Sequence, residues 1–205
     1  MKYRNLIVDG PNEPATDADI ARVEEILGAE LPDDYKAFLK ACNGGHLDYE
    51  FPVQFEDGTE ENLSLCSFHE LISPGSWETN PFELENMRNM DGFPSSGVLP
   101  IARDGGSSQL FLDLRDGYRV VAFVHGLPAW TGLRQKDSLV QLAESFDDYW
   151  DRLMISDFYV QDFITNYDPK YGNPDLAAEW LDTGHPSWRE KYSEIWKKHV
   201  LDAHK

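Results

Sequence analysis

Residues 26–39 read Ile-Leu-Gly-Ala-Glu-Leu-Pro-Asp-Asp-Tyr-Lys-Ala-Phe-Leu, and Asn43-Gly44-Gly45 follows shortly after them. Gly28 predicts the end of one helix. Pro32, followed by two acids, predicts the start of the next, because proline fits the first helical turn. Asn43-Gly44-Gly45 then predicts the second helix end, since these residues tolerate the left-handed backbone conformation. The stretch therefore predicts two short helices joined by a tight turn.

Upstream, the first of these helices has a clear start signal. Thr16 followed by Asp19 resembles a capping box. Ile20, Val23 and Leu27 recur at helical spacing, which predicts one buried face. The apolar stripe of the second helix comprises Tyr35, Phe38, Leu39 and Cys42.

Downstream, the apolar period changes from helical to two. Apolar residues occupy every second position from Leu47 to Phe55, which is typical of a half-buried strand. Pro52 places that strand at a sheet edge or interrupts it. Asp57-Gly58 is a hairpin signal, and Leu63 and Leu65 suggest the returning strand.

Three closely spaced strands are predicted further on, at residues 98–102, 109–114 and 118–125. Glycine-containing turns separate them, which favours an antiparallel meander. Between the hairpin and this meander, residues 73–97 are rich in turn residues, with a short helix expected from Asn80 through Met90. Ser138 with Gln141 predicts a capping box for a long helix. Its apolar face would comprise Leu139, Leu142, Phe146, Trp150 and Leu153.

The last 50 residues favour helices at 158–164, 175–181 and 187–203. The whole pattern predicts an α+β fold, in which a central, mainly antiparallel sheet is flanked by helices. We expect one domain at residues 1–155 and a helical C-terminal extension at 156–205, packed on the same domain.

The charge is strongly negative and locally segregated. The 205 residues carry 37 acids and 18 Lys or Arg, a net charge of −19, and no Lys or Arg lies between Ala41 and Met87. Such a field repels nucleic acid and anionic membranes, so neither is an expected partner. It attracts a basic protein. The alternative is that the acidity only keeps the protein soluble.

The sequence predicts neither an enzyme nor a metal or cofactor site. It has no phosphate-binding loop, nucleophile elbow or zinc-binding His-Glu-x-x-His motif. Asp104-Gly105-Gly106 favours a tight turn over an anion cradle. Cys42 lies on an apolar helix face, so a buried and inert thiol is expected. The sequence shows no long apolar run and no signal-peptide pattern, so we expect a cytoplasmic location.

Three segments, in this order, resemble the SUKH superfamily, which includes the yeast cell-wall-synthesis regulator domain and many bacterial immunity proteins. The first is residues 26–39 with Asn43-Gly44-Gly45. The second is residues 99–102 with Asp104-Gly105-Gly106, followed by 110–113. The third is the late helix ending at residues 146–150. The resemblance implies an α+β domain that binds rather than catalyses, often as the antidote to a toxin such as a nuclease. It transfers no binding site.

The leading hypothesis is therefore an immunity protein that binds a cognate basic toxin domain through an acidic surface, as a monomer or homodimer. Its alternative is a regulatory or scaffold module for a cellular client. Aromatic residues in loops are favoured binding anchors, although they can equally cap the core. The predicted contact residues are Asp48, Glu50, Glu56, Asp57, Glu60, Glu61, Trp77 and Trp130.

Overall fold

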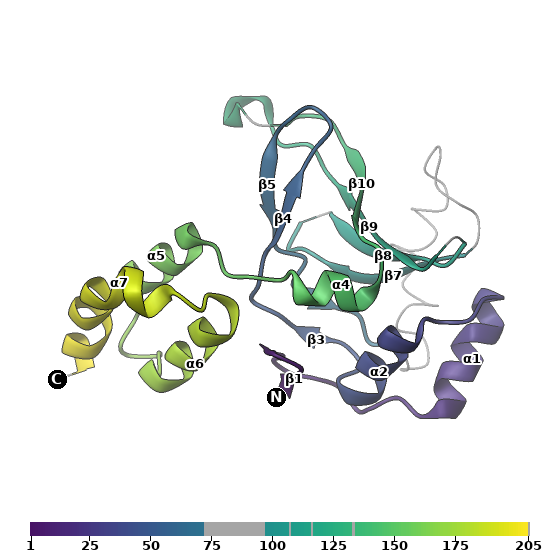
Figure 1. Ribbon diagram of the computed structural model, residues 1–205, viewed down its shortest axis with the longest axis horizontal. Helices are drawn as coiled ribbons and strands as arrows, with labels where there is room; N and C mark the ends of the chain where they lie inside the picture. Colours follow the sequence, from purple (N-terminus) through teal and green to yellow (C-terminus); the bar gives the residue numbers. More distant parts are fainter. Residues whose placement is uncertain (72–96, 107, 116, 133, 205) are drawn as a thin grey trace.

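The computed structural model describes residues 1–71, 97–106, 108–115, 117–132 and 134–204. The expected helix from Asn80 to Met90 and Trp77 lie outside these ranges. The centre of the fold is a sheet with strand order β10-β9-β8-β7-β6-β3, in which every neighbouring pair is antiparallel (Figure 1). Its strands are β3 (Gly45–His46), β6 (Ser67–Phe68), β7 (Val98–Arg103), β8 (Gln109–Asp113), β9 (Arg119–Val124) and β10 (Ser138–Ala143).

The predicted meander is confirmed by strands β7 to β9. Leu112 of β8 pairs with Leu99 of β7 and with Val120 of β9, and all three side chains are buried. The turn between β7 and β8 is closed by Asp104, whose Oδ1 accepts hydrogen bonds from the Gly106 and Ser108 amides at 2.7 and 3.1 Å. Because these amides already donate to the Asp104 carboxylate, they are not available to bind an anion. The loop is therefore a tight turn, not an anion site.

The two predicted N-terminal helices are confirmed as α1 (Asp17–Leu27) and α2 (Asp33–Ala41). At the start of α1 the capping box is complete, because the Thr16 hydroxyl accepts from the Asp19 amide and the Asp19 carboxylate accepts from the Thr16 amide. Gly28 ends the helix at φ 65°. Cys42 is buried, and burial raises its thiol pKa to about 11, which suits an inert core residue. Cys66 is free and partly exposed.

Asn43-Gly44-Gly45 joins α2 to the sheet, and each residue has a structural reason. Asn43 is buried at φ 43°, where its side chain donates to the Glu13 carbonyl and accepts from the Leu71 amide. Gly45 lies so close to the N-terminal segment that a Cβ there would approach the Val8 side chain to 2.8 Å. The motif therefore specifies a backbone crossing.

The predicted long helix from Ser138 is wrong. Residues Ser138–Ala143 form β10, which pairs with β9, and helix α4 (Phe146–Asp151) begins only after Ser145. The Ser145 hydroxyl accepts from the Asp148 amide at 3.0 Å, so this serine is the helix cap. The open edge of β9 needs a hydrogen-bonding partner, and tertiary pairing outweighs the local cap signal of Ser138.

Helices α2 and α4 cover the sheet through an aromatic core. The Phe38 ring lies 5.4 Å from Trp150 and 5.3 Å from Phe146 between ring centroids. Asp34 of α2 accepts a hydrogen bond from the Asp147 amide at 2.9 Å, and thus places a carboxylate at the N-terminus of α4. The resembling segments around residues 34 and 147 are therefore in direct contact.

Two small hairpins flank the sheet. The first comprises β1 (Lys2–Tyr3) and β2 (Leu6–Ile7). The second comprises β4 (Phe51–Gln54) and β5 (Glu60–Leu63), and it projects from the body of the molecule (Figure 1). The alternating stretch from Leu47 is thus a regular strand only from Phe51 onward.

The expected C-terminal helices are present as α5 (Asp157–Thr165), α6 (Pro174–Gly184) and α7 (Trp188–Trp196), with a π-helical turn and a final 3-10 turn after α7. They lie together at one end of the molecule (Figure 1). Tyr49 connects them to the domain, because its hydroxyl accepts from the Ile7 amide and bonds to the Thr183 hydroxyl at 2.7 Å. Leu181, Trp188 and Val200 belong to the same cluster of buried apolar residues as the sheet.

Candidate functional site

The projecting hairpin and the loop beside it are the candidate site, and we call them together the hairpin lobe. The lobe comprises residues 51–63, with β4 and β5, and residues 125–132 and 134–137, between β9 and β10. The loop includes the 3-10 turn η1 (Ala129–Thr131), which projects from the body of the molecule at the same end as the hairpin tip (Figure 1).

The hairpin turn is built by Asp57-Gly58, as the sequence predicts, and Thr59 completes it. Gly58 adopts φ 85°, and its amide donates to the Phe55 carbonyl at 2.9 Å. The Asp57 carboxylate accepts from the Thr59 amide at 3.0 Å and from the Thr59 hydroxyl, and these bonds lower the pKa of Asp57. Asp57 is therefore held in its charged form at the tip.

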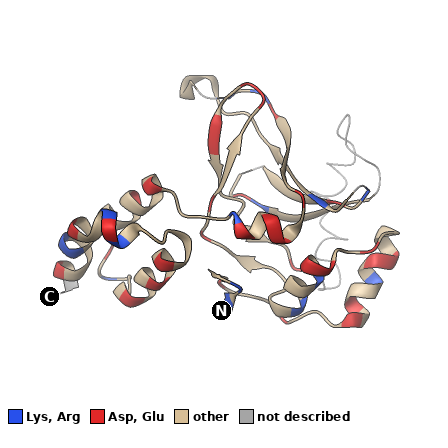
Figure 2. Ribbon diagram, viewed as in Figure 1, with Lys and Arg blue, Asp and Glu red and all other residues tan. Residues whose placement is uncertain are grey.

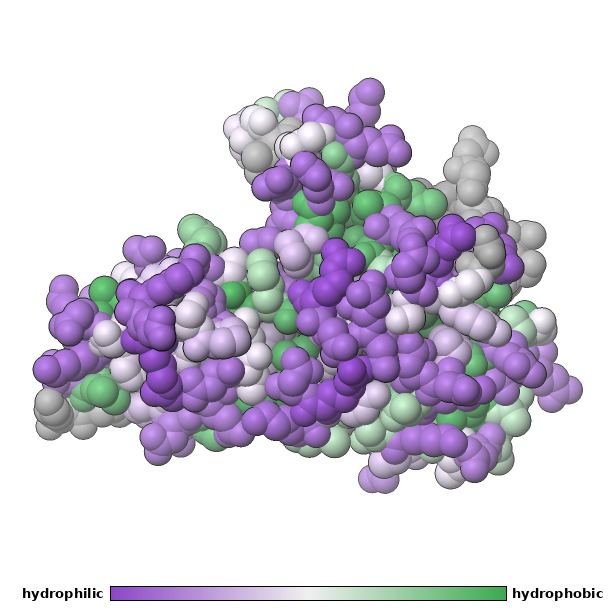
Figure 3. Space-filling view, viewed as in Figure 1, coloured by the Kyte–Doolittle hydropathy of each residue, from purple (hydrophilic) through white to green (hydrophobic). Residues whose placement is uncertain are grey.

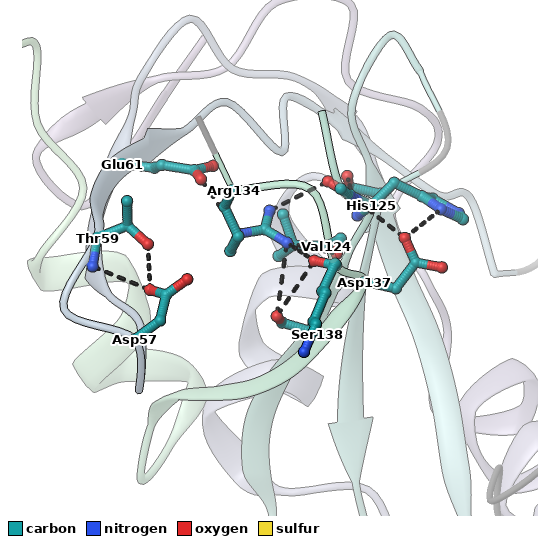
Figure 4. A network of polar contacts seen from close by, with 11 residues as sticks. Asp57, Thr59, Glu61, Val124, His125, Arg134, Asp137 and Ser138 are labelled. Atoms are coloured by element: carbon teal, nitrogen blue, oxygen red, sulfur yellow. Dashed lines mark hydrogen bonds and ion pairs between the residues drawn. The ribbon is translucent and has the colours of Figure 1, made fainter. Parts of the chain in front are cut away.

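Arg134 fastens the loop to the hairpin from inside (Figure 4). Its side chain is only 2 % exposed, and its Nε donates to Glu61 Oε1 at 3.1 Å. Its Nη2 donates to the His125 carbonyl at 3.0 Å, and the guanidinium lies 4.2 Å from the centre of the Phe55 ring. Glu61 is thus neutralised within the chain, and the lobe is held together by one buried ion pair.

Three features of the lobe face solvent. Glu56 and Glu60 are exposed, and in the described part of the chain neither makes an ion pair. Trp130 is 87 % exposed on η1. An exposed large aromatic side chain and exposed carboxylates on one lobe are the composition of a protein-binding surface.

A hollow of about 460 Å³ runs between the hairpin and β10. Its lining combines Glu56 and Asp57 with Leu139, which is 63 % exposed. Figure 3 shows hydrophobic side chains gathered where the lobe meets the body of the molecule, on a face that is otherwise mostly hydrophilic. His125 and Asp137 contact each other at the rim, with a distance of 3.2 Å from Nδ1 to Oδ1 (Figure 4).

The other predicted acids lie elsewhere. Asp48 and Glu50 belong to the segment before β4 and face the C-terminal helices. Glu50 accepts from the Ser156 amide at 3.0 Å, and its backbone bridges to Met154, so it already has a structural role. Asp48 is exposed and lies 3.0 Å from His46 Nε2. The structure therefore brings together four of the six predicted acids and separates the other two from them.

Acidic residues also cover α1, α4 and α6, so the negative field extends beyond the hairpin lobe (Figure 2). Lowered carboxylate pKa values have structural causes. Lys40 lowers the pKa of Asp17, Arg115 that of Asp113 and Arg189 that of Asp182. Among the described residues no group of three His, Cys, Asp or Glu is placed to hold a metal ion.

The sequence comparison agrees with this architecture. The model of the SMI1 / KNR4 family (SUKH-1) matches residues 14–152, which is more than half of the chain. The chain belongs to the SUKH-1 family. The match begins just before α1 and ends just after α4, so it includes the sheet and the hairpin lobe. No curated protein matches the chain.

The SUKH-1 match leaves the C-terminal helices outside it. None of the helices in the described ranges has the length and apolar character needed to span a bilayer.

Sequence reasoning missed Arg134, because an isolated arginine in a loop, 73 positions from Glu61, carries no local pattern.

Proposed function

We propose that this SUKH-1 chain is an immunity protein, which binds and neutralises a cognate bacterial toxin in the cytoplasm through the hairpin lobe. SUKH-1 membership supports a binding role, and the lobe supplies the surface. The observation that carries the proposal is that the same lobe exposes Trp130 together with Glu56 and Glu60, two acids that form no ion pair with the described residues.

The toxin expected on this surface is basic. A nuclease is basic where it contacts phosphates, so an acidic projection can cover that groove without catalysis. Long-range attraction also speeds the encounter. Arg134 holds the loop against the hairpin before binding, which reduces the ordering that association requires.

The decisive experiment combines growth rescue and binding. The toxin domain of the large secreted protein encoded beside this gene is expressed with and without this chain. Rescue and a stoichiometric complex, with an association rate that falls as salt rises, are expected. Neither rescue nor binding would contradict the proposal and favour the regulatory module for a cellular client.

The contact surface is tested by a charge-matched pair of variants. Glu56→Lys with Glu60→Lys should slow association by on the order of tenfold, because both reversals lie in the proposed interface. Glu25→Lys with Glu194→Lys changes the net charge equally at exposed positions on α1 and α7 and should have a much smaller effect. If both pairs of variants slow association equally, the association rate depends on the overall charge, and the lobe is not the contact surface.

Trp130→Ala tests the aromatic part of the same surface. Its side chain is almost fully exposed, so the free protein should keep its stability. If the indole is an anchor, affinity should fall by on the order of thirtyfold, mainly through faster dissociation. An unchanged dissociation rate would exclude Trp130 from the interface.

A further inference from the structure

A second surface lies where the domain meets the C-terminal helices. A groove of about 610 Å³ is lined by α5, α6 and the loop between them, together with Asp48 from the segment before β4. This groove is separate from the hairpin lobe, and the predicted interface does not include it apart from Asp48.

The walls of the groove are aromatic and held in place. The Trp180 ring lies 4.9 Å from Phe163 and 5.7 Å from Tyr159 between centroids, both in edge-to-face geometry. Trp180 Nε1 donates to the Asp48 carbonyl at 3.1 Å, which fixes the indole. Gly172 packs so tightly on Tyr167 that a Cβ there would lie 2.4 Å from the ring. The groove is therefore formed before any ligand arrives.

The groove is also negatively charged. Asp48, Asp162 and Asp168 contribute to its lining, and the described lining contains no Lys or Arg. Burial is the main cause of the raised pKa of Tyr159, and the negative charges of Asp48, Glu50 and Asp162 raise it further. At one side, Tyr171 is 78 % exposed and already has a cation on its ring, since Lys170 Nζ lies 4.7 Å from the ring centroid.

We propose that this groove binds an arginine side chain presented by a basic partner protein. Aromatic faces and nearby carboxylates together select a cation. Arginine fits better than lysine, because its flat guanidinium can stack on a ring and bond to a carboxylate at once. A second copy of this chain is disfavoured as the occupant, because both copies carry a net charge of −19. The proposal rests on the proposed function only for the identity of the partner.

The test uses the full chain and a defined probe. The probe is a Gly-Gly-Arg-Gly-Gly peptide blocked at both ends, titrated into isotope-labelled protein while the Trp180 indole signal is followed by NMR. That signal is assigned with Trp180→Phe. The control peptide carries citrulline, which keeps the shape of arginine without its charge. The arginine peptide should give saturable shifts of the Trp180 signal. The citrulline peptide should bind with an affinity at least fivefold lower.

Variants then locate the contact. Tyr171→Ala and Asp162→Asn should each weaken peptide binding severalfold. Phe158→Ala and Glu194→Gln are the matched controls, an exposed aromatic and an exposed acid outside the groove, and should leave it unchanged.

Three results would overturn the proposal. The first is no shift of the Trp180 signal, and the second is equal shifts with both peptides. The third is a shift that depends on protein concentration in the absence of peptide, which would mean that a second copy of the chain occupies the groove. The toxin rescue experiment is independent. Rescue without peptide binding would remove only the groove, and peptide binding without rescue would leave the groove and remove the toxin.

Discussion

At the scale of single residues, Arg134 supports the hairpin lobe more than any surface acid does. Arg134→Met removes the partner of half-buried Glu61 and the donor side chain that bonds the Val124 and His125 carbonyls. Breaking a buried ion pair from one side is strongly destabilising, so we expect the free energy of unfolding to fall by about 3 kcal/mol. Urea denaturation measures this loss.

A double variant separates the ion pair from the packing. Arg134→Met with Glu61→Gln leaves no unpaired charge and should cost less than Arg134→Met alone. Lys40→Ala, which removes an exposed pair with Asp17, should leave stability nearly unchanged, because water screens an exposed ion pair. Equal losses in the single and double variants would mean that the unpaired Glu61 carboxylate costs nothing and that the loss comes from the packing and carbonyl hydrogen bonds of Arg134. No local pattern connects Arg134 to Glu61, which is why the sequence could not predict this residue.

At the scale of elements, the sequence correctly predicts the helix ends that are set by hydrogen bonds between neighbouring residues. The Thr16 cap and the Gly28 stop are made by neighbouring residues, and both are confirmed. The cap predicted at Ser138 does not form, because residues 138–143 pair with the edge of β9 instead. A cap signal reflects only the next few residues and cannot report this pairing. Both interpretations bury Leu142, so the apolar pattern alone cannot separate strand from helix.

This correction predicts the outcome of two serine substitutions. Ser145→Ala removes the hydroxyl that accepts from the Asp148 amide and should reduce the free energy of unfolding by about 1 kcal/mol. Ser138→Ala lies at the start of β10 and should cost less, since it caps no helix. Chemical denaturation of both variants compares them, and a larger loss at Ser138 would restore the helical interpretation.

Asp157 joins α5 to α7, and its effect depends on pH. Hydrogen bonds from Lys191, Tyr192 and His185 hold the pKa of Asp157 well below its usual range. A carboxylate whose pKa is lower in the folded state stabilises the fold above its unfolded pKa and loses this effect as pH falls. Because the side chain is largely exposed, the contribution is no more than about 1 kcal/mol.

Asp157→Asn should therefore destabilise the chain at pH 7 and show a smaller loss of stability than the unmodified chain between about pH 5 and pH 2. Thermal unfolding across this range measures the difference. Parallel pH profiles for the two proteins would exclude the lowered pKa of Asp157.

At the scale of the whole molecule, charge segregation in sequence did not become one acidic face. Within its described part, the predicted contact acids of the basic-free stretch lie in two places, the hairpin lobe and the segment of Asp48 and Glu50, because the chain turns into β4 between them. The sequence could predict the fold class and the acids of the hairpin turn. It could not predict that Glu50 and Glu61 are used inside the molecule, since their partners, the Ser156 amide and Arg134, are remote.

The C-terminal helices and the SUKH-1 domain share a contact that tests whether they fold as one unit. Gly184 at the end of α6 faces Ile155, and a Cβ there would approach Ile155 Cγ1 to 2.4 Å and Tyr49 to 2.9 Å. Gly184→Ala should thus reduce the free energy of unfolding by about 2 kcal/mol through overpacking.

Gly105→Ala is the control, because a Cβ there meets nothing within 4 Å. If the helices are part of the same cooperative unit, Gly184→Ala should lower one single transition seen both by circular dichroism and by tryptophan fluorescence. Two transitions, with only the one reporting α6 and α7 lowered, would instead make residues 156–205 an independently folding extension. The arginine groove would then depend on how that extension docks, because Asp48 and Trp180 come from opposite sides of the contact.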